Sequence, residues 1–125
     1  MGRTLLIVLG LINLAWGLFA LAQPTEAASW VGLESTTAAA TGELRALYGG
    51  LFVAFGVTLL VRPQWAGAVA IAYTGIALTR VLSLFLDGFE TFTLTALGVE
   101  GFLALLLFKA ASTHLASAKS EAGRP

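Results

Sequence analysis

The chain has 125 residues, of which 58% are hydrophobic and only 11% charged, and its mean hydropathy is +0.87. Soluble domains carry about 25% charged residues, so this composition indicates a small membrane protein with a single domain. The formal net charge is zero, and no basic stripe points to a nucleic-acid partner. The absence of Cys and the single His114 argue against disulfides, thiol catalysis, a Ser-His-Asp triad and a His-based metal site.

Four apolar runs approach the roughly 20 residues that a helix needs to cross a bilayer. They predict an all-α fold, a transmembrane four-helix bundle that fills residues 1–109. We expect its spans at residues 4–22, 44–61, 65–86 and 91–108. Residues 110–125 are polar and small, and they predict a frayed cytoplasmic tail.

The connections between these runs carry helix-ending residues. Pro63 predicts a tight turn between the second and third spans, and Gly88 predicts the end of the third helix. The long connection at residues 23–43 is rich in Ala, Ser and Thr, and it would place Trp30 at the level of the lipid head groups.

Charge is distributed asymmetrically over the connections. In a four-span topology the basic residues fall on one side, and the acidic residues of the connections fall on the other. The positive-inside rule then predicts a multi-pass inner-membrane protein with both termini in the cytoplasm. The basic set is Arg3, Arg62, Lys109, Lys119 and Arg124, and the acidic set is Glu26, Glu34, Asp87 and Glu90.

The first run has a second interpretation. An N-terminal Arg3 followed by an apolar run that ends Ala20-Leu21-Ala22 resembles a signal peptide with its cleavage site. However, the run is longer than the usual hydrophobic region of about 7 to 15 residues. Gly10, Asn13, Gly17 and Ala20 also form a small-residue face that suits helix packing. Both interpretations, a retained span and a cleaved signal, stay open.

Polar residues inside the spans are the candidate site. At 1.5 Å per residue, Arg80 would lie roughly 10 Å and Glu100 roughly 14 Å below the outer ends of their helices. A charge at such depth is costly unless it is paired or lines a wet cavity. We expect a polar pocket in the outer half of the bundle. Its candidate ligand-binding residues are Asn13, Arg45, Tyr48, Tyr73, Arg80 and Glu100, and its polar network is Glu43, Ser83 and Asp87.

Two interpretations of these charges remain. We expect Arg80 to pair with Glu100; this could be a structural ion pair that fixes helix register, or the two residues could form a ligand or proton site. We also expect Arg45 to pair with Glu43 or Asp87. No nucleophile or metal ligand stands beside Glu100, so the sequence predicts no catalytic residue and no metal site.

The run Gly42-Glu43-Leu44-Arg45-Ala46-Leu47-Tyr48-Gly49-Gly50 resembles DUF4345, a family of small bacterial four-span membrane proteins of unknown function. Leu78-Thr79-Arg80-Val81-Leu82-Ser83, the following Asp87-Gly88 and Glu100 fit the same pattern. The four-span layout is more distantly similar to DoxX-type membrane proteins. The resemblance covers most of residues 1–109; it implies a four-helix bundle and no established activity.

Three functions fit these features. The first is a binding or accessory module that holds a lipid-like or quinone-like molecule, or a partner membrane protein, in the bilayer; its cofactor, if any, is unknown. The second is a membrane enzyme of the isomerase or oxidoreductase kind, in which Glu100 moves a proton beside Arg80. The third is a small proton-coupled transporter. The small residues Ala68 and Ala72 would permit a homo-oligomer.

Overall fold

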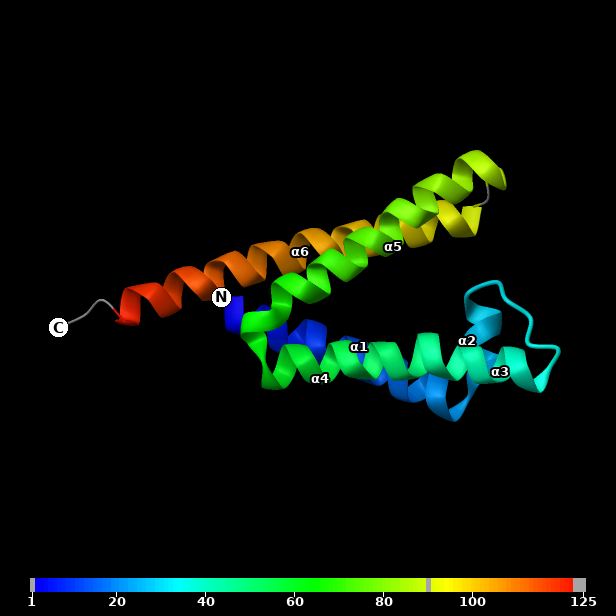
Figure 1. The fold of residues 1–125 in the computed structure, drawn as a ribbon, viewed down its shortest axis with the longest axis horizontal. Helices are drawn as coiled ribbons and strands as arrows, with labels where there is room; N and C mark the ends of the chain where they lie inside the picture. The colour runs from blue at the N-terminus through cyan, green and yellow to red at the C-terminus, as the bar shows by residue number, and fades with distance from the viewer. Residues whose placement is uncertain (1, 90, 123–125) are drawn as a thin grey trace. The chain divides into compact units, whose positions relative to one another are not determined.

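The computed structural model describes residues 2–89 and 91–122, and every regular element in this part of the chain is helical (Figure 1). The all-α prediction is therefore confirmed. Glu90 and Arg124, two of the charges used to orient the chain, lie outside the described residues. In chain order the elements are α1 (Gly2–Ala22), α2 (Pro24–Trp30), α3 (Ala38–Leu44), the π-helical segment η1 (Arg45–Gly50), α4 (Leu51–Val61), the 3₁₀ turn η2 (Pro63–Trp65), α5 (Ala66–Leu86) and α6 (Thr91–Ala122).

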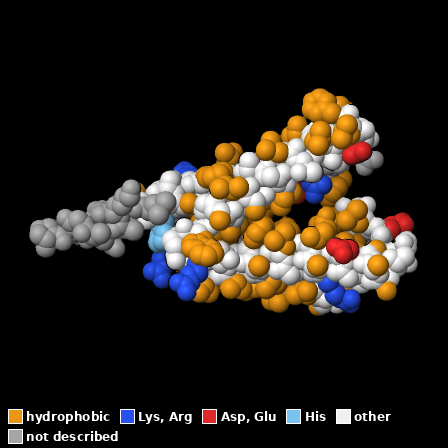
Figure 2. Space-filling model, viewed as in Figure 1, with side chains coloured by type: hydrophobic (Ala, Val, Ile, Leu, Met, Phe, Trp, Pro, Cys, Tyr) orange, Lys and Arg blue, Asp and Glu red, His pale blue; other side chains and the backbone are white. Residues whose placement is uncertain are grey.

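Four of the helical stretches are long and apolar enough to cross a membrane. They are Gly2–Ala22, Ala38–Val61, Pro63–Leu86 and Thr91–His114. On the face shown in Figure 2, hydrophobic side chains cover much of the surface of the long helices, as lipid-facing surfaces require. The chain is thus a multi-pass membrane protein. The second stretch begins earlier than predicted, and α6 continues through residue 110 to Ala122, beyond the predicted domain boundary.

The chain divides into two compact units. One comprises Met1–Leu6 and Arg62–Pro125, and the other comprises Ile7–Val61. In the first unit α5 and α6 pack side by side (Figure 1). The predicted helix breaks at both ends of α5 are confirmed. Pro63 begins the 3₁₀ turn that precedes α5, and after Asp87 caps the helix, Gly88 has a φ of +101°.

Gly88 supports a first prediction, because its backbone lies in a region that L side chains rarely adopt. We expect Gly88→Ala to lower the free energy of unfolding by about 1–3 kcal/mol. Gly98→Ala is the matched control, because Gly98 lies within α6 and an added Cβ would have nothing within 4 Å. Denaturation of both variants in mixed micelles, followed by circular dichroism, measures the difference. Equal stabilities of the two variants would contradict the positive φ of Gly88.

In the second unit α1 and α4 pack antiparallel through alternating small and large residues. A Cβ added to Gly10 would meet the Leu60 side chain, and one added to Gly17 would meet Val53. The pattern is reciprocal, because Gly56 of α4 faces Leu14 of α1. Glycine on each helix therefore receives a bulky residue of the other, which brings the two backbones close together. The small-residue face predicted on the first run does pack against a neighbouring helix.

The connection between α1 and α3 is also ordered. α2 buries Ala27 and Ala28. The Trp30 ring lies 5.2 Å from Phe19 and 6.2 Å from Trp16 of α1, measured between ring centroids. The Trp30 Nε1–H donates a hydrogen bond of 3.1 Å to Glu26 Oε1. The long connection expected at residues 23–43 thus begins with a short helix held against α1 by aromatic contacts.

Candidate functional site

The most distinctive segment of the sequence coincides with a distinctive backbone. The run from Glu43 to Gly50 begins in the last turn of α3 and continues through η1, where the helix winds more loosely than an α-helix. The N–H of Leu51 donates to the carbonyl of Ala46, five residues earlier. Short π-helical turns of this kind occur frequently at functional sites. Gly49 is buried here, and a Cβ at this position would lie 2.6 Å from Leu21 Cδ2 of α1.

A pocket of about 340 Å³ lies beside this turn, within the second unit. Its size is at the lower end of the range for small-molecule sites, roughly 300–1,000 Å³. The lining residues that belong to α3 and η1 share one helical face, because they recur at spacings of three and four. Two further residues come from the loop that precedes α3. The lining is Leu33, Glu34, Ala40, Glu43, Leu44, Leu47 and Tyr48.

The lining is largely apolar but carries two carboxylates. Glu34 and Glu43 are both exposed, and among the described residues neither side chain forms a hydrogen bond or an ion pair within the protein. The half-buried Tyr48 ring is stacked on Phe52, with centroids 6.4 Å apart and an interplanar angle of 5°. Figure 2 shows acidic side chains among hydrophobic ones at the α3 end of this unit. The pocket therefore combines an apolar wall, an aromatic face and negative charge.

Arg45 lies outside the pocket lining. It is exposed, and within the described residues no ion pair joins it to Glu43. Residues two apart do not face each other on a helix, which explains why Glu43 lines the pocket and Arg45 does not. The expected Arg45–Glu43 pair is thus not formed. A pair between Arg45 and Asp87 would join the two units and stays a prediction.

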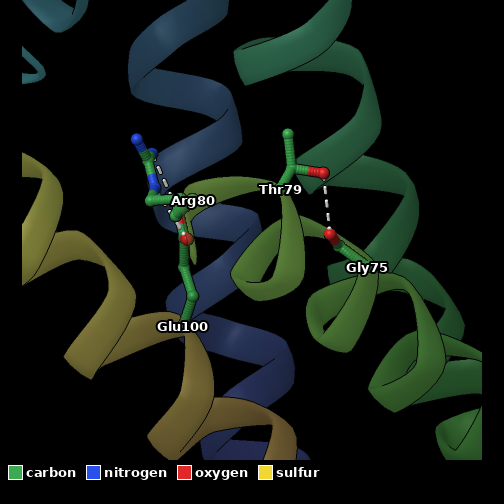
Figure 3. Close-up of polar contacts among 4 residues, drawn as sticks. All are labelled: Gly75, Thr79, Arg80 and Glu100. Atoms are coloured by element: carbon green, nitrogen blue, oxygen red, sulfur yellow. Dashed lines mark hydrogen bonds and ion pairs between the residues drawn. The ribbon is translucent and has the colours of Figure 1, made fainter. Parts of the chain in front are cut away.

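The predicted pairing of Arg80 with Glu100 is confirmed (Figure 3). Arg80 Nε donates to Glu100 Oε2 at 2.8 Å, and Arg80 Nη2 donates to Glu100 Oε1 at 3.0 Å. The side chains are 23% and 15% exposed, so the pair is largely enclosed where α5 and α6 pack together. This bidentate geometry is the strong form of the Arg–carboxylate interaction.

An aromatic ring also lies beside the Arg80 guanidinium. Its Cζ lies 5.6 Å from the centroid of the Phe92 ring on α6, within the range of a cation–π interaction. The adjacent residue, Thr79, donates a hydrogen bond from its hydroxyl to the Gly75 carbonyl. Its side chain therefore points away from the Arg80–Glu100 pair (Figure 3). Both Glu100 and Phe92, which contact the Arg80 guanidinium, belong to α6.

The remaining predicted site residues lie at separate places. Asn13 is 2% exposed, and its side-chain amide donates to the Leu9 carbonyl of its own helix at 2.9 Å. Tyr73 is 2% exposed on α5, Ser83 is half-buried, and Asp87 is exposed at the end of α5. No cluster of metal-ligating side chains occurs within the described residues.

Four of the predicted residues thus form two clusters, one in each unit. Glu43 and Tyr48 line the pocket of the second unit, whereas Arg80 and Glu100 form the ion pair of the first. A common polar pocket built from all four long helices would require residues of both units. It stays a prediction, as does a ligand contact for Asn13 or Tyr73.

Sequence reasoning missed part of each cluster. Ala40, Leu44 and Leu47 share the helical face of Glu43 and Tyr48, and this periodicity was a readable signal. Phe92 precedes Glu100 by eight residues and could have been placed on the same face of α6. Leu33 and Glu34 carried no such signal, because a loop has no periodicity from which to place its side chains.

Comparison with known families assigns the chain. The family model described as "Domain of unknown function (DUF4345)" matches residues 1–111, which include both clusters. No curated protein and no solved structure matches the chain. The residues that carried the resemblance, from Glu43 to Gly50 and around Arg80 and Glu100, are those that form the π-helical turn and the ion pair. The chain belongs to the DUF4345 family.

Proposed function

We propose that this protein is a non-catalytic binding or accessory module of the membrane that holds an amphipathic small molecule beside η1. The observation that supports this most directly is the pocket of about 340 Å³ lined by Leu33, Glu34, Ala40, Glu43, Leu44, Leu47 and Tyr48. Apolar pockets with a few polar groups are the usual binding sites for small molecules. A molecule with an apolar body and a polar end, such as a lipid, matches that lining.

The backbone at the pocket supports the same proposal. A π-helical turn is less favourable than a continuous α-helix, and such turns are frequent at functional sites. Here η1 supplies Leu47 and Tyr48 to the pocket. Meanwhile Gly49 allows close contact with Leu21 of α1. The turn therefore presents residues to the pocket while the opposite side keeps α1 in place.

We further propose that the chain is an inner-membrane protein with both termini in the cytoplasm, as the charge asymmetry indicates. In that orientation the pocket, near the start of the second spanning stretch, opens toward the outer leaflet. Retention of residues 1–22 as a span is supported by the reciprocal packing of Gly10, Gly17 and Leu14 against α4. The ligand would reach the pocket from the lipid side or from the outer head-group layer.

Proton chemistry at Glu100, on which both an enzyme and a proton-coupled transporter would depend, receives less support. Both carboxylate oxygens accept hydrogen bonds from Arg80. The bidentate pair already gives the Glu100 charge a structural partner. A binding role does not depend on Glu100, because the pocket residues lie in the other unit.

The test is native mass spectrometry of the protein extracted from membranes. We expect the wild type to carry a small-molecule adduct and Ala40→Trp to lack it, because an indole at this half-buried lining position fills the pocket. Ala39→Trp is the matched control, since Ala39 is the exposed neighbour on α3 and does not line the pocket. It should keep the adduct.

Two outcomes would overturn the proposal. An adduct that survives in Ala40→Trp would lie elsewhere on the protein. A wild type without any adduct, extracted in mild detergent that keeps lipids bound to other membrane proteins, would show that the pocket is not a ligand site. Circular dichroism of both Trp variants confirms that they fold alike.

A further inference from the structure

We infer that the pocket beside η1 selects membrane amphiphiles whose head group carries an ammonium. This inference rests on the proposed function, since it names the chemical class of the molecule that the pocket would hold. The juxtaposition that carries it is a pair of exposed carboxylates and a half-buried aromatic ring at an open, largely apolar pocket: Glu34, Glu43 and Tyr48.

Charge complementarity is the first step. The residues that line the pocket include two carboxylates and no Lys or Arg. Within the described part of the chain, neither carboxylate forms an ion pair, and the nearby Arg45 is exposed outside the lining. A cation entering the pocket would gain charge-assisted hydrogen bonds that the protein does not itself supply. An anionic head group would meet two like charges.

The second step is the aromatic wall. Tyr48 is half-buried and stacked on Phe52, which in turn lies 6.0 Å from Phe55, so the Tyr48 ring is held in place. Ammonium groups bind the faces of aromatic rings within about 6 Å, and the attraction increases when the site is partly desolvated. Carboxylates together with a fixed ring form a site for an ammonium, as in other proteins that recognise such cations.

The third step explains why the occupant is a membrane amphiphile rather than a free cation. Most of the lining is aliphatic: Leu33, Ala40, Leu44 and Leu47. These residues lie at and just before the start of the spanning stretch Ala38–Val61, where a head group and the first part of an acyl chain occupy adjacent layers. A soluble amine would leave this aliphatic wall without a partner.

The experiment compares three probes with the same chain and different heads: dodecylammonium, dodecanoate and dodecanol. Each is added to the full-length protein in a neutral maltoside detergent, and bound probe is measured by native mass spectrometry. We expect dodecylammonium to bind at least tenfold more tightly than either other probe. Glu34→Gln with Glu43→Gln should remove this preference, and Tyr48→Leu should weaken it severalfold.

Glu26→Gln is the matched control. Glu26 is an exposed carboxylate of α2 outside the pocket, and the amide oxygen of Gln can still accept the Trp30 hydrogen bond. This variant should keep the full preference for dodecylammonium. A preference that survives in Glu34→Gln with Glu43→Gln would mean that the cation binds elsewhere, and equal binding of all three probes would mean that the pocket does not select a charge.

Failure of this inference is distinguishable from failure of the proposed function. If the three probes bind equally but all are lost in Ala40→Trp, the pocket is a binding site without head-group selectivity, and only the present inference is wrong. If dodecylammonium binds the wild type and Ala40→Trp alike, the pocket is not the site and both proposals are wrong. A soluble probe, butylammonium, should not compete, because it lacks the chain that the aliphatic wall accommodates.

Discussion

Arg80→Ala is expected to lower the free energy of unfolding by about 3–5 kcal/mol, the largest effect of any single substitution considered for this protein. The substitution removes both hydrogen bonds to Glu100 and the contact with Phe92. Glu100, only 15% exposed, would then lose its cationic partner. Denaturation by SDS in mixed micelles, followed by circular dichroism, measures the loss.

Two further variants test whether the stability lost in Arg80→Ala comes from the broken ion pair. Arg80→Met combined with Glu100→Leu removes both charges, and we expect it to recover most of the lost stability, because an apolar pair of similar size needs no partner. Arg62→Ala removes an exposed charge for which no ion pair is recorded within the described residues, and it should change stability by less than about 0.5 kcal/mol. If Arg80→Ala alone proved as stable as the wild type, the structural role of the pair would be refuted and its role as a ligand or proton site would gain support.

The second large effect is expected at the close contact between α1 and α4. A Cβ on Gly17 would lie 2.5 Å from the backbone nitrogen of Val53, and a Cβ on Gly56 would lie 2.7 Å from that of Leu14. The backbone cannot move aside without separating the helices. We therefore expect Gly17→Ala and Gly56→Ala each to destabilise the protein by about 1–3 kcal/mol. The same SDS titration measures the loss.

The other glycines provide graded controls. A Cβ on Gly10 or Gly49 would meet mainly the side chains of Leu60 or Leu21, which can shift, so these substitutions should cost less. A Cβ on Gly67 or Gly75 would meet nothing within 4 Å, and Ala there should be neutral or stabilise α5 by up to about 1 kcal/mol. Equal effects at Gly17 and Gly67 would contradict the packing of α1 on α4.

The ion pair shows which part of the site could be predicted from sequence. A lone Arg and a lone Glu within two apolar helices have few partners, and the cost of burying either charge alone makes their pairing the natural expectation. The structure confirms it at 2.8 Å. The short connection through Gly88 also favours antiparallel neighbours, which brings Arg80 and Glu100 to comparable depths.

The pocket shows what could not be predicted in the same way. Its position depends on the order of the loop that carries Leu33 and Glu34, and a loop has no periodicity from which to place its side chains. Helical spacing alone puts Glu43, Leu47 and the other lining positions of α3 and η1 on one face, but it does not show that this loop lies against that face.

The sequence by itself determined the class of this protein, the four apolar helices and the breaks at Pro63 and Gly88, because hydropathy and backbone restrictions act locally and every residue contributes to them. It also predicted the pairing of Arg80 with Glu100, because a lone charge in an apolar span is costly, and the structure confirms that pairing. Only the tertiary structure decided which small residues of α1 meet α4, how η1 is wound and which side chains enclose the pocket. These features depend on contacts between segments distant in sequence, and local preferences do not specify such contacts.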